Sequence, residues 1–255
     1  MALNSISTKA KIGTNVTVGD FTVIKDDVEI GNNVVVGSNV IIDNGARISD
    51  NVTLHHGAVI STIPQDLKFG GEVTTLEIGE NTVVREYATL NRGTAASGKT
   101  VVGKDCLLMA YSHVAHDCRV GNNVIIANCG TLGGHVEVDD RAIVGGLVAV
   151  HQYVKIGTHS ILAGFTKAVK DIPPYIMAGG NPMKFEGLNI IGLKRRGFTS
   201  EQTDGIKEFY KLLYKSGLNI SDALQNIKQT LPNTDEINII LNFIQRSTRG
   251  ILTDK

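Results

Sequence analysis

An aliphatic side chain recurs at every sixth position along most of this chain. The spacing is unbroken from Ile6 to Ile60, and it returns over 78–90 and over 102–168. A small or β-branched residue follows most of these aliphatics four positions later. A period of six fits neither an α-helix, which turns residues six apart onto different faces, nor a strand with its period of two. The pattern predicts a coil of short strands in which positions i and i+4 point inward.

The residues between these inward positions predict corners. Glycine often follows the aliphatic, and Asn or Asp often stands two or three positions after it, as in Gly31-Asn32-Asn33 and Gly121-Asn122-Asn123. These residue types serve turns in which positive φ is often needed. Trp is absent, aromatic residues are only 5% and glycine numbers 28, so we expect a core of small aliphatic residues in a regular stack.

Interruptions of the period predict loops. The phase breaks roughly over Thr62–Thr75 and over Ala95–Lys99, and we expect both segments to project from the coil. Long excursions from a regular scaffold tend to carry function.

The repeat ends after about Asp171, and the pattern becomes helical from Phe198. N-capping residue types indicate where these helices begin, and we expect starts near Thr199 or Ser200, at Ser221 and at Asp235.

The hexads resemble those of the hexapeptide-repeat family, whose fold is a left-handed parallel β-helix. In that family three hexads close one triangular coil, so residues 18 apart stack directly on one another. The left-handedness is what the resemblance implies, and it runs against the usual right-handed crossover. We therefore expect a mainly β chain, with a left-handed β-helix over residues 1–188 and a small helical C-terminal domain over 189–255.

Charge and cysteine content argue against several classes of protein. The 25 basic residues balance 25 acidic ones, so no bulk attraction to nucleic acid or to a membrane surface is expected. Three cysteines are too few for a disulfide framework, which fits a reducing compartment. No signal peptide and no apolar run of transmembrane length are visible, so we expect a cytoplasmic protein without stable membrane insertion.

One corner of the coil concentrates groups capable of acid–base chemistry. His116 and Asp117 follow the inward Val114, so we expect both to be exposed on the outside. An imidazole titrates near neutral pH, and a neighbouring carboxylate can fix its tautomer and stabilise its charged form. Stacking adds a glycine whose N–H could bind an oxyanion. The group expected at this corner is His116, Asp117, Gly134, His135, His151 and Gln152.

Six segments narrow the resemblance to one family, the UDP-N-acetylglucosamine O-acyltransferases of lipid A synthesis. They are Gln65-Asp-Leu-Lys68, Ala115-His-Asp-Cys118, Gly133-Gly-His135, Ala149-Val-His-Gln152, Pro173-Pro-Tyr175 and Gly192-Leu-Lys-Arg-Arg-Gly-Phe198. The resemblance implies transfer of a 3-hydroxyacyl chain from acyl carrier protein to the 3-hydroxyl of UDP-N-acetylglucosamine. It also implies a homotrimer with active sites between neighbouring prisms, no metal, and no cofactor beyond the phosphopantetheine on the carrier protein.

The resemblance further implies roles for individual residues. His116 would be the general base, Asp117 would orient it, and the Gly134 N–H would stabilise the oxyanion. Gly164 would leave space at the end of the acyl groove and so favour a long acyl chain. The residues expected to bind the sugar nucleotide or the acyl-phosphopantetheine are Asp66, Lys68, His113, His135, His151 and Gln152, with Asn189, Arg195 and Arg196 on the nucleotide and its phosphates.

Two positions depart from the family pattern. Asn91 stands where a His is common, and Ile191 stands where an acidic residue is common, which leaves a related amino-sugar nucleotide open as the acceptor. Lys68 could equally be a solvated loop charge, and Lys194–Arg196 could instead meet the acidic carrier protein. Cys106 and Cys118 fall at inward positions and are expected to be core residues.

Three other functions are known for β-helices of this kind, and the sequence can be compared with each. The related N-acyltransferase of the same pathway carries an additional N-terminal domain, whereas the hexads here begin at Ile6. A zinc hydrase on this scaffold needs three imidazole ligands, for which His113, His116 and His135 could be imagined, but its His-x4-His ligand spacing is missing. A non-enzymatic ice-binding or scaffold helix would show flat Thr ladders, whereas the outward faces here are charged and irregular.

Overall fold

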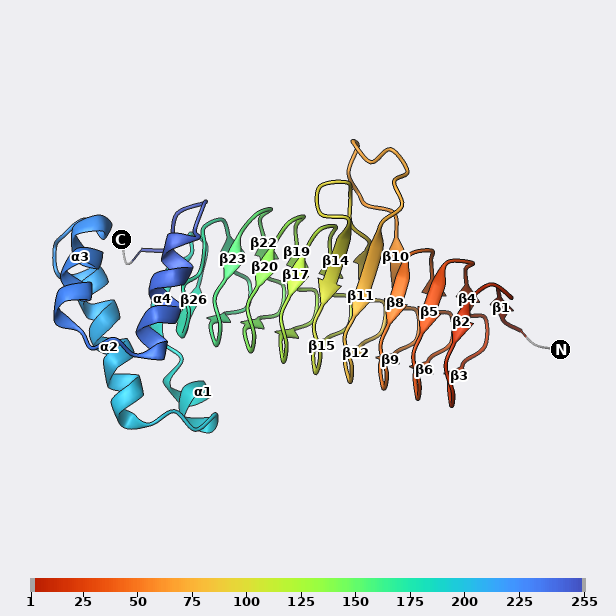
Figure 1. The fold of residues 1–255 in the computed structure, drawn as a ribbon, viewed down its shortest axis with the longest axis horizontal. Coiled ribbons are helices and arrows are strands. Elements are labelled where there is room, and N and C mark those ends of the chain that lie inside the picture. Colours follow the sequence, from red (N-terminus) through yellow and green to blue (C-terminus); the bar gives the residue numbers. More distant parts are fainter. Residues whose placement is uncertain (1–2, 254–255) are drawn as a thin grey trace.

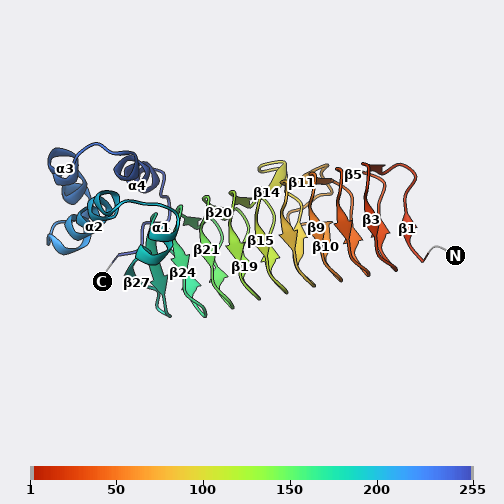
Figure 2. The same cartoon turned by 90° about the horizontal axis from the view of Figure 1, so that it is seen from below.

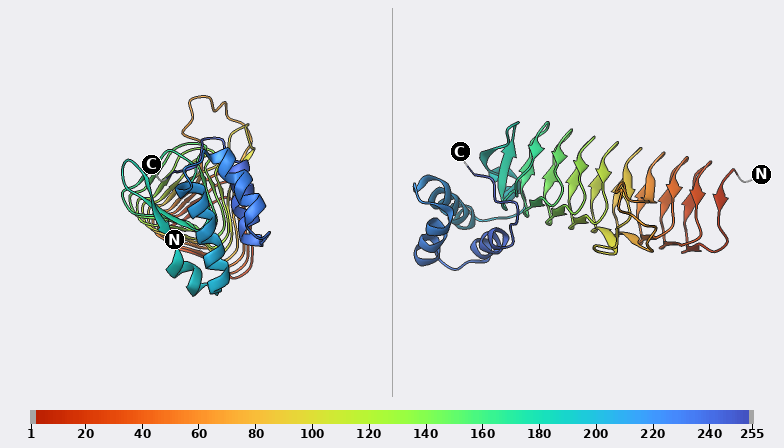
Figure 3. Two further views of the ribbon diagram at one scale, coloured as in Figure 1. Left: turned by 90° about the vertical axis from the view of Figure 1, so that its left-hand side faces the viewer. Right: turned by 90° about the horizontal axis from the view of Figure 1, so that it is seen from above.

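The computed structural model describes residues 3–253, which form a long rod with a cluster of helices at its C-terminal end (Figure 1). The rod is a parallel β-helix, because successive strands pass in turn to three sheets and pair with the strand one turn away. Seen end-on, the turns superpose on one another (Figure 3). The predicted β coil followed by helices is therefore present.

We name the three sheets A, B and C, and the corners between them AB, BC and CA. Sheet A contains β1 (Ser5–Ile6), β4 (Val23–Ile24), β7 (Ile41–Ile42), β10 (Val59–Thr62), β13 (Thr89–Asn91), β16 (His113–Val114), β19 (Thr131–Leu132), β22 (Ala149–Val150) and β25 (Lys167–Ala168). Sheet B contains β2 (Lys11–Ile12), β5 (Val28–Ile30), β8 (Ala46–Ile48), β11 (Thr75–Ile78), β14 (Lys99–Val102), β17 (Arg119–Val120), β20 (Glu137–Val138) and β23 (Lys155–Ile156). Sheet C contains β3 (Thr17–Val18), β6 (Val35–Val36), β9 (Thr53–Leu54), β12 (Val83–Val84), β15 (Leu107–Leu108), β18 (Ile125–Ile126), β21 (Ile143–Val144), β24 (Ile161–Leu162), β26 (Ile176–Gly179) and β27 (Lys184–Leu188).

The register confirms the expected stacking of residues 18 apart. Val114 pairs with Leu132, and Leu132 pairs with Val150, in successive layers of sheet A. The spacing lengthens only where a loop is inserted, as between Ile60 and Leu90. Segments 63–74 and 92–98 are those loops, and both project from the same side of the rod (Figure 1). Both predicted loops are confirmed.

The core is a stack of aliphatic side chains from positions i and i+4. Val36, Val40 and Ile42 are almost completely buried, as are their counterparts in later layers. Each such burial contributes about 1.5–3 kcal/mol relative to an exposed side chain. Ile6 and Ile12 differ, since they are 40% and 39% exposed. They belong to the first turn of the described chain, which is packed against another turn on one side only.

Glycine and Asn have different roles at the corners from those we expected. Positive φ falls on position i+3, for example 56° at both Asn33 and Asn123, and not on the glycine at i+1. That glycine is needed for close packing, because a Cβ on Gly31 would lie 2.3 Å from Oδ1 of Asp50 in the next layer. The same Oδ1 accepts a hydrogen bond from the Asn32 N–H at 2.7 Å. Side chains at i+2 therefore satisfy the backbone of the layer before them.

Four helices follow the rod: α1 (Ile190–Arg195), α2 (Ser200–Lys215), α3 (Ile220–Thr230) and α4 (Asp235–Gln245). Thr199 caps α2 through a capping box, and α4 begins at the predicted Asp235. The predicted start of α3 at Ser221 is wrong by one residue, because the side chain of Asn219 accepts from the Asp222 N–H and caps the helix. Figure 2 shows these helices gathered at one end of the rod. Within residues 3–253, no helix is long and apolar enough to cross a membrane.

The helical part is tied to the rod by a buried carboxylate. Asp171 has no exposed surface and accepts hydrogen bonds from Ser247 Oγ at 2.6 Å and from the Lys155 N–H at 2.8 Å. The phenol of Tyr210 donates to the Pro174 carbonyl at 2.7 Å. These bonds hold the C-terminal segment against the last turn of the coil.

Candidate active site

His116 and Asp117 form a hydrogen-bonded pair at the AB corner, just after β16. The Nδ1 atom of His116 lies 2.8 Å from Oδ2 of Asp117. Both residues point away from the core, as predicted, but the expectation that they are exposed is wrong, since each is only 4% exposed. Loop 92–98 covers Asp117, because Thr94 and Ser97 contact its carboxylate, while His116 lies against Gly134 and His135.

The carboxylate of Asp117 is held by several donors. Oδ1 accepts from the Thr94 N–H at 3.0 Å and from the Ser97 hydroxyl, and Oδ2 accepts from Thr94 Oγ1 at 2.7 Å. Burial alone would raise the pKa of Asp117, but hydrogen bonds from Ser97, His116 and Thr94 outweigh it and lower the pKa to about 2. An ionised carboxylate only accepts, so Nδ1 of His116 donates to it, and in the neutral imidazole Nε2 has the free lone pair.

Gly134 lies directly against His116 in the next layer. A Cβ at this position would be 2.6 Å from Cε1 of His116, so no other residue fits without displacing the imidazole. The Gly134 N–H makes no hydrogen bond within residues 3–253, whereas the equivalent N–H of Asn122 donates to Asp140. The base and an unpaired backbone donor are therefore neighbours at one corner.

The aromatic side chains of His135 and Tyr153 complete this edge. Nε2 of His135 is 3.7 Å from Oδ2 of Asp117, and its ring meets that of His116 edge-on, with centroids 5.2 Å apart. Tyr153 stacks on His135 at 4.5 Å with an interplanar angle of 5°. Burial lowers the pKa of His135, while the carboxylates of Asp117 and Asp66 act in the opposite direction.

Tyr153 was missed by the sequence analysis, although a signal exists. His135 and Tyr153 both occupy the i+3 position, with φ of 61° and 66°. Non-glycine residues other than Asn and Asp are uncommon at such angles. Phe21, Tyr87, Tyr111 and Phe165 hold the same conformation at the CA corner, so the signal specific to Tyr153 is its place 18 residues after His135.

The remaining predicted residues of the AB corner lie around this group. His113 is half-buried, its Nδ1 is 2.7 Å from Oγ1 of Thr89, and burial lowers its pKa. His151 and Gln152 are exposed, and Nδ1 of His151 lies 3.1 Å from the Gln152 carbonyl oxygen. The structure therefore brings together the whole set expected at this corner.

Loop 63–74 carries Asp66 and Lys68 on the same side of the rod. Asp66 is close enough for its charge to act on His135, whereas Lys68 is exposed. Asn91, one of the two departures from the family pattern, is 2% exposed and donates to Thr62 Oγ1 at 2.9 Å and to the carbonyl of Ile63 at 3.0 Å. Asn91 thus anchors the start of the loop.

Asn189 and Arg196 lie at the BC corner instead, away from His116. Asn189 is buried, caps α1 by accepting from the Gly192 N–H at 3.1 Å, and donates to the His159 carbonyl at 2.9 Å. Nη1 of Arg196 is 3.0 Å from Nδ1 of His159. Burial, aided by Arg196 and Arg141, lowers the pKa of His159 to about 4, so its neutral imidazole accepts from Arg196.

Arg195 and Ile191, also on α1, are both exposed. Gly164 lies at the third corner, CA, where it too is exposed. A Cβ there would meet only the Gly146 carbonyl oxygen, at 3.2 Å. One chain therefore distributes the predicted base, the predicted arginines and the predicted acyl-length residue over three different corners.

The three imidazoles needed by a zinc hydrase do not gather. Within residues 3–253, the group of His, Cys, Asp or Glu side chains whose donor atoms approach within 4.8 Å of one another is His116, Asp117 and His135. His113 lies outside this group, and both oxygens of Asp117 already accept hydrogen bonds. The arrangement fits a hydrogen-bonded base better than a three-histidine metal site.

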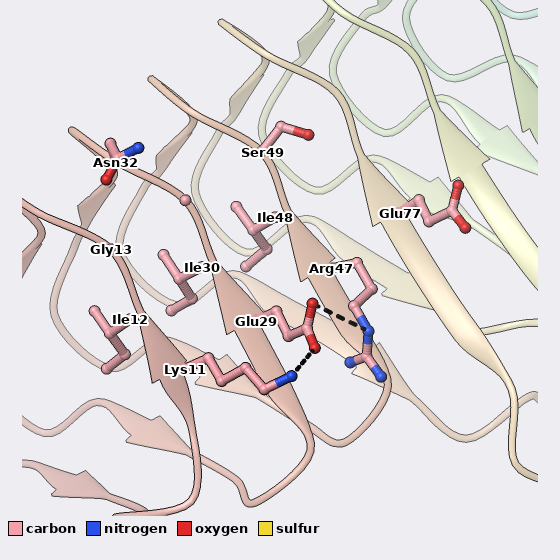
Figure 4. A pocket seen from close by; sticks show the side chains of 11 residues that line it. Lys11, Ile12, Gly13, Glu29, Ile30, Asn32, Arg47, Ile48, Ser49 and Glu77 are labelled. Carbon is pink, nitrogen blue, oxygen red and sulfur yellow. Dashed lines mark hydrogen bonds and ion pairs between the residues drawn. The ribbon is translucent and has the colours of Figure 1, made fainter.

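A separate groove on sheet B, near the N-terminal end, combines a ladder of surface charges with Ile12, Ile30 and Ile48 and the polar Asn32 and Ser49 (Figure 4). Lys11 Nζ is 2.7 Å from Glu29, and Arg47 Nε is 4.0 Å from the same carboxylate. Exposed pairs of this kind contribute little to stability. Neither the base nor any other predicted site residue lines this groove.

Solved structures with this fold cover the whole chain. A UDP-N-acetylglucosamine acyltransferase from Bacteroides fragilis 9343 has 44% sequence identity and a TM-score of 0.95, covering 99% of both chains. One from Francisella novicida has 37% identity and a TM-score of 0.96, covering 100% of this chain and 94% of that one. Verminephrobacter eiseniae (strain EF01-2) has a relative, 45% identical over 76% of each chain, named acyl-(acyl-carrier-protein)–UDP-N-acetylglucosamine O-acyltransferase. A protein of Burkholderia orbicola (strain MC0-3) with the same name is 41% identical over 77% of each chain.

The model of the bacterial transferase hexapeptide family matches residues 9–44 and 99–134, so the protein is a left-handed parallel β-helix of the hexapeptide transferase class. The model described as UDP N-acetylglucosamine O-acyltransferase, domain 2, matches residues 171–252. The chain belongs to the acyl-(acyl-carrier-protein)–UDP-N-acetylglucosamine O-acyltransferase family. The predicted fold class and family are confirmed.

Proposed function

We propose that the protein moves a 3-hydroxyacyl chain from acyl carrier protein to the 3-hydroxyl of UDP-N-acetylglucosamine, the first step of lipid A synthesis. The observation that carries this proposal is the AB corner, where His116, its ionised partner Asp117 and the unpaired N–H of Gly134 are neighbours. Relatives at 45% and 41% identity bear the name of this activity.

The corner supports direct attack on the thioester. Nε2 of His116 removes the proton of the sugar hydroxyl as its oxygen attacks the thioester carbonyl. The Gly134 N–H stabilises the negative charge on the tetrahedral intermediate, and Asp117 stabilises the imidazolium. Collapse breaks the carbon–sulfur bond, and His116 returns its proton to the departing phosphopantetheine thiolate. The products are the ester and the free carrier thiol, with no covalent acyl-enzyme.

The distribution of groups supports a homotrimer with shared sites. His116, Arg196 and Gly164 lie on the AB, BC and CA corners of one chain, so a single copy cannot direct all three at one ligand. Neighbouring copies that bring different corners together would complete the site. The CA corner also exposes apolar side chains that a neighbour could cover, namely Phe21, Tyr87, Tyr111, Leu147 and Phe165.

An acyl-transfer assay with UDP-N-acetylglucosamine and a panel of 3-hydroxyacyl carrier proteins tests the activity. We expect ester formation by the wild type and a loss of about 100-fold to 10,000-fold in His116→Ala. Gln225→Ala is the control, because Gln225 is exposed on α3, a helix that holds none of the predicted site residues. Absence of transfer by the wild type would refute the function, and full activity of His116→Ala would refute the mechanism.

The assay also settles the acceptor. A 3-amino analogue of the sugar nucleotide, offered beside UDP-N-acetylglucosamine, distinguishes ester from amide formation. We expect the ester, and preferential acylation of the amine would assign the protein to the related amino-sugar branch.

A further inference from the structure

Loop 92–98 carries two hydroxyl residues that no part of the proposed mechanism uses directly. We infer that Thr94 and Ser97 are positioning residues for acyl transfer, which hold the Asp117 carboxylate turned toward His116. This inference rests on the proposed function for its kinetic consequence, whereas its geometric content is independent of the substrate.

The loop reaches Asp117 because of where it leaves the coil. Leu90 in β13 pairs with Val114 in β16, so the two strands occupy adjacent layers of sheet A. The phase break that follows β13 therefore opens at the AB corner, one layer from Asp117. The extra residues fold over the neighbouring layer instead of continuing the coil.

Three donors of this loop converge on one carboxylate. The N–H and the hydroxyl of Thr94 bind different oxygens of Asp117, at 3.0 and 2.7 Å. The Thr94 hydroxyl also accepts from the Ala96 N–H at 3.2 Å, which directs its proton toward Asp117. The Ser97 hydroxyl lies between Asp117 and the Lys99 carbonyl, and its single proton favours the charged acceptor.

The backbone of Asp117 is fixed from the other side. Its N–H donates to Oγ1 of Thr100 at 2.8 Å, and Thr100 is fully buried. Side chain and main chain of Asp117 are thus both held by the segment that follows β13. The side chain of Asp117 has no exposed surface, so solvent cannot replace a lost donor without rearrangement.

Thr94 and Ser97, which we call the clamp, share the negative charge of Asp117 among several hydrogen-bond donors. When a hydroxyl is removed, more of that charge acts on His116 and holds a proton on the imidazole more tightly. The base then becomes free only at higher pH. A residue that served only the fold would lower activity equally at all pH values.

The test compares Thr94→Val and Ser97→Ala with the wild type in pH profiles of kcat/KM. We expect a loss of about tenfold at neutral pH in each variant, with the acid limb moved upward by as much as about one pH unit. Thr94→Ser retains the hydroxyl, so its kcat/KM at neutral pH and the position of its acid limb should both match the wild type. If the acid limb of the kcat/KM profile stayed at its wild-type pH in Thr94→Val and in Ser97→Ala, the proposal would be overturned.

Ser247→Ala is the matched control. Its hydroxyl binds the buried carboxylate of Asp171 at 2.6 Å, and Asp171 lies three layers along the same corner from Asp117, so the same chemical change is made in a similar environment away from His116. We expect its acid limb to coincide with that of the wild type. A similar displacement in Ser247→Ala would show that the shift is unspecific and would remove support for the clamp.

The imidazole nitrogens provide a readout that needs no substrate. In the wild type, 15N NMR of His116 at neutral pH should show a protonated Nδ1, and Ser97→Ala should alter its Nδ1 signal and move its titration upward. An unchanged titration refutes the clamp whether or not the enzyme acylates the sugar. Failure of acyl transfer with an altered titration would refute the proposed function alone.

Discussion

The imidazole of His116 rests on the backbone of Gly134, and a Cβ added to Gly134 would lie 2.6 Å from its Cε1 atom. Gly134→Ala must therefore displace the base or the strand layer beneath it. We expect kcat/KM to fall about 100-fold, since a misplacement near 1 Å has effects of that size, with a stability cost of about 1–3 kcal/mol. Gly205→Ala is the control, because a Cβ there meets nothing within 4 Å. A fully active Gly134→Ala enzyme would contradict the described contact.

Tyr153 is predicted to shield His135 through ring stacking. Tyr153→Asn removes the ring, while Asn suits the φ of 66°, so thermal stability should be retained. Since burial lowers the pKa of His135, its pKa should rise in Tyr153→Asn and stay unchanged in Tyr153→Phe. NMR titration of the His135 ring measures both. Equal pKa values in all three proteins would exclude the shielding role.

Shared active sites predict complementation between inactive copies. His116→Ala and an Arg195→Ala/Arg196→Ala double variant, co-expressed with different tags and purified as mixed oligomers, should regain about one third of the wild-type activity per site. That fraction follows because a mixed trimer of either composition has one interface of its three in which an intact base meets intact arginines. A mixture of His116→Ala with Asp117→Asn, which affects a single corner, should regain nothing. No recovery in the first mixture would mean that each copy acts alone.

Gly164 is predicted to limit acyl length. From His116 to Gly164 the chain climbs between two and three layers, which corresponds to roughly 13 Å along the rod. Gly164→Met would place a side chain in space that is now bordered only by the Gly146 carbonyl oxygen. We expect its preference to shift toward shorter acyl carrier proteins, while the preferred donor of Gly205→Ala remains that of the wild type. An identical preference in Gly164→Met would disprove this role.

The low pKa of His159 predicts that the folded protein loses stability in mild acid. Its pKa is about 4 in the folded protein and 6.5 without perturbation, so the unfolded chain binds more protons between these values. Stability contributed by neutral His159 is complete above about pH 6.5 and declines as the pH falls toward 4. His159→Asn should flatten this part of the stability curve, measured by chemical denaturation from pH 4 to 7. A curve parallel to the wild type would contradict the predicted titration.

The hexad period was sufficient to predict the layers, the inward positions and both loops, because every hexad repeats the same pattern of inward and outward positions. It could not predict the burial of His116 and Asp117. The burial of Asp117 depends on Thr94 and Ser97, which lie in loop 92–98, where the periodic signal gives no information on side-chain contacts. The base, its partner and Gly134 were predicted to stack and do so, whereas their catalytic roles remain predictions.

Other site features needed local knowledge of the corners. The ring of Tyr153 stacks on His135 because the two residues share one corner position 18 residues apart, and the role of that position was not known beforehand. Asn189 was expected to face the nucleotide, but its cap on α1 and its bond to His159 depend on how the helices dock. Neither contact can be deduced from spacing along the chain.

The left-handed position at each corner has a broader consequence. At the BC corner, Asn15, Asn33 and Asn51 turn the chain and their amides join successive layers by hydrogen bonds, whereas at the AB corner His135 and Tyr153 occupy the same backbone conformation. Replacing Asn by an aromatic residue in this conformation costs about 1–2 kcal/mol. Substitutions can therefore alter one corner of one layer at a time, and new specificities can arise while the β-helix itself is retained.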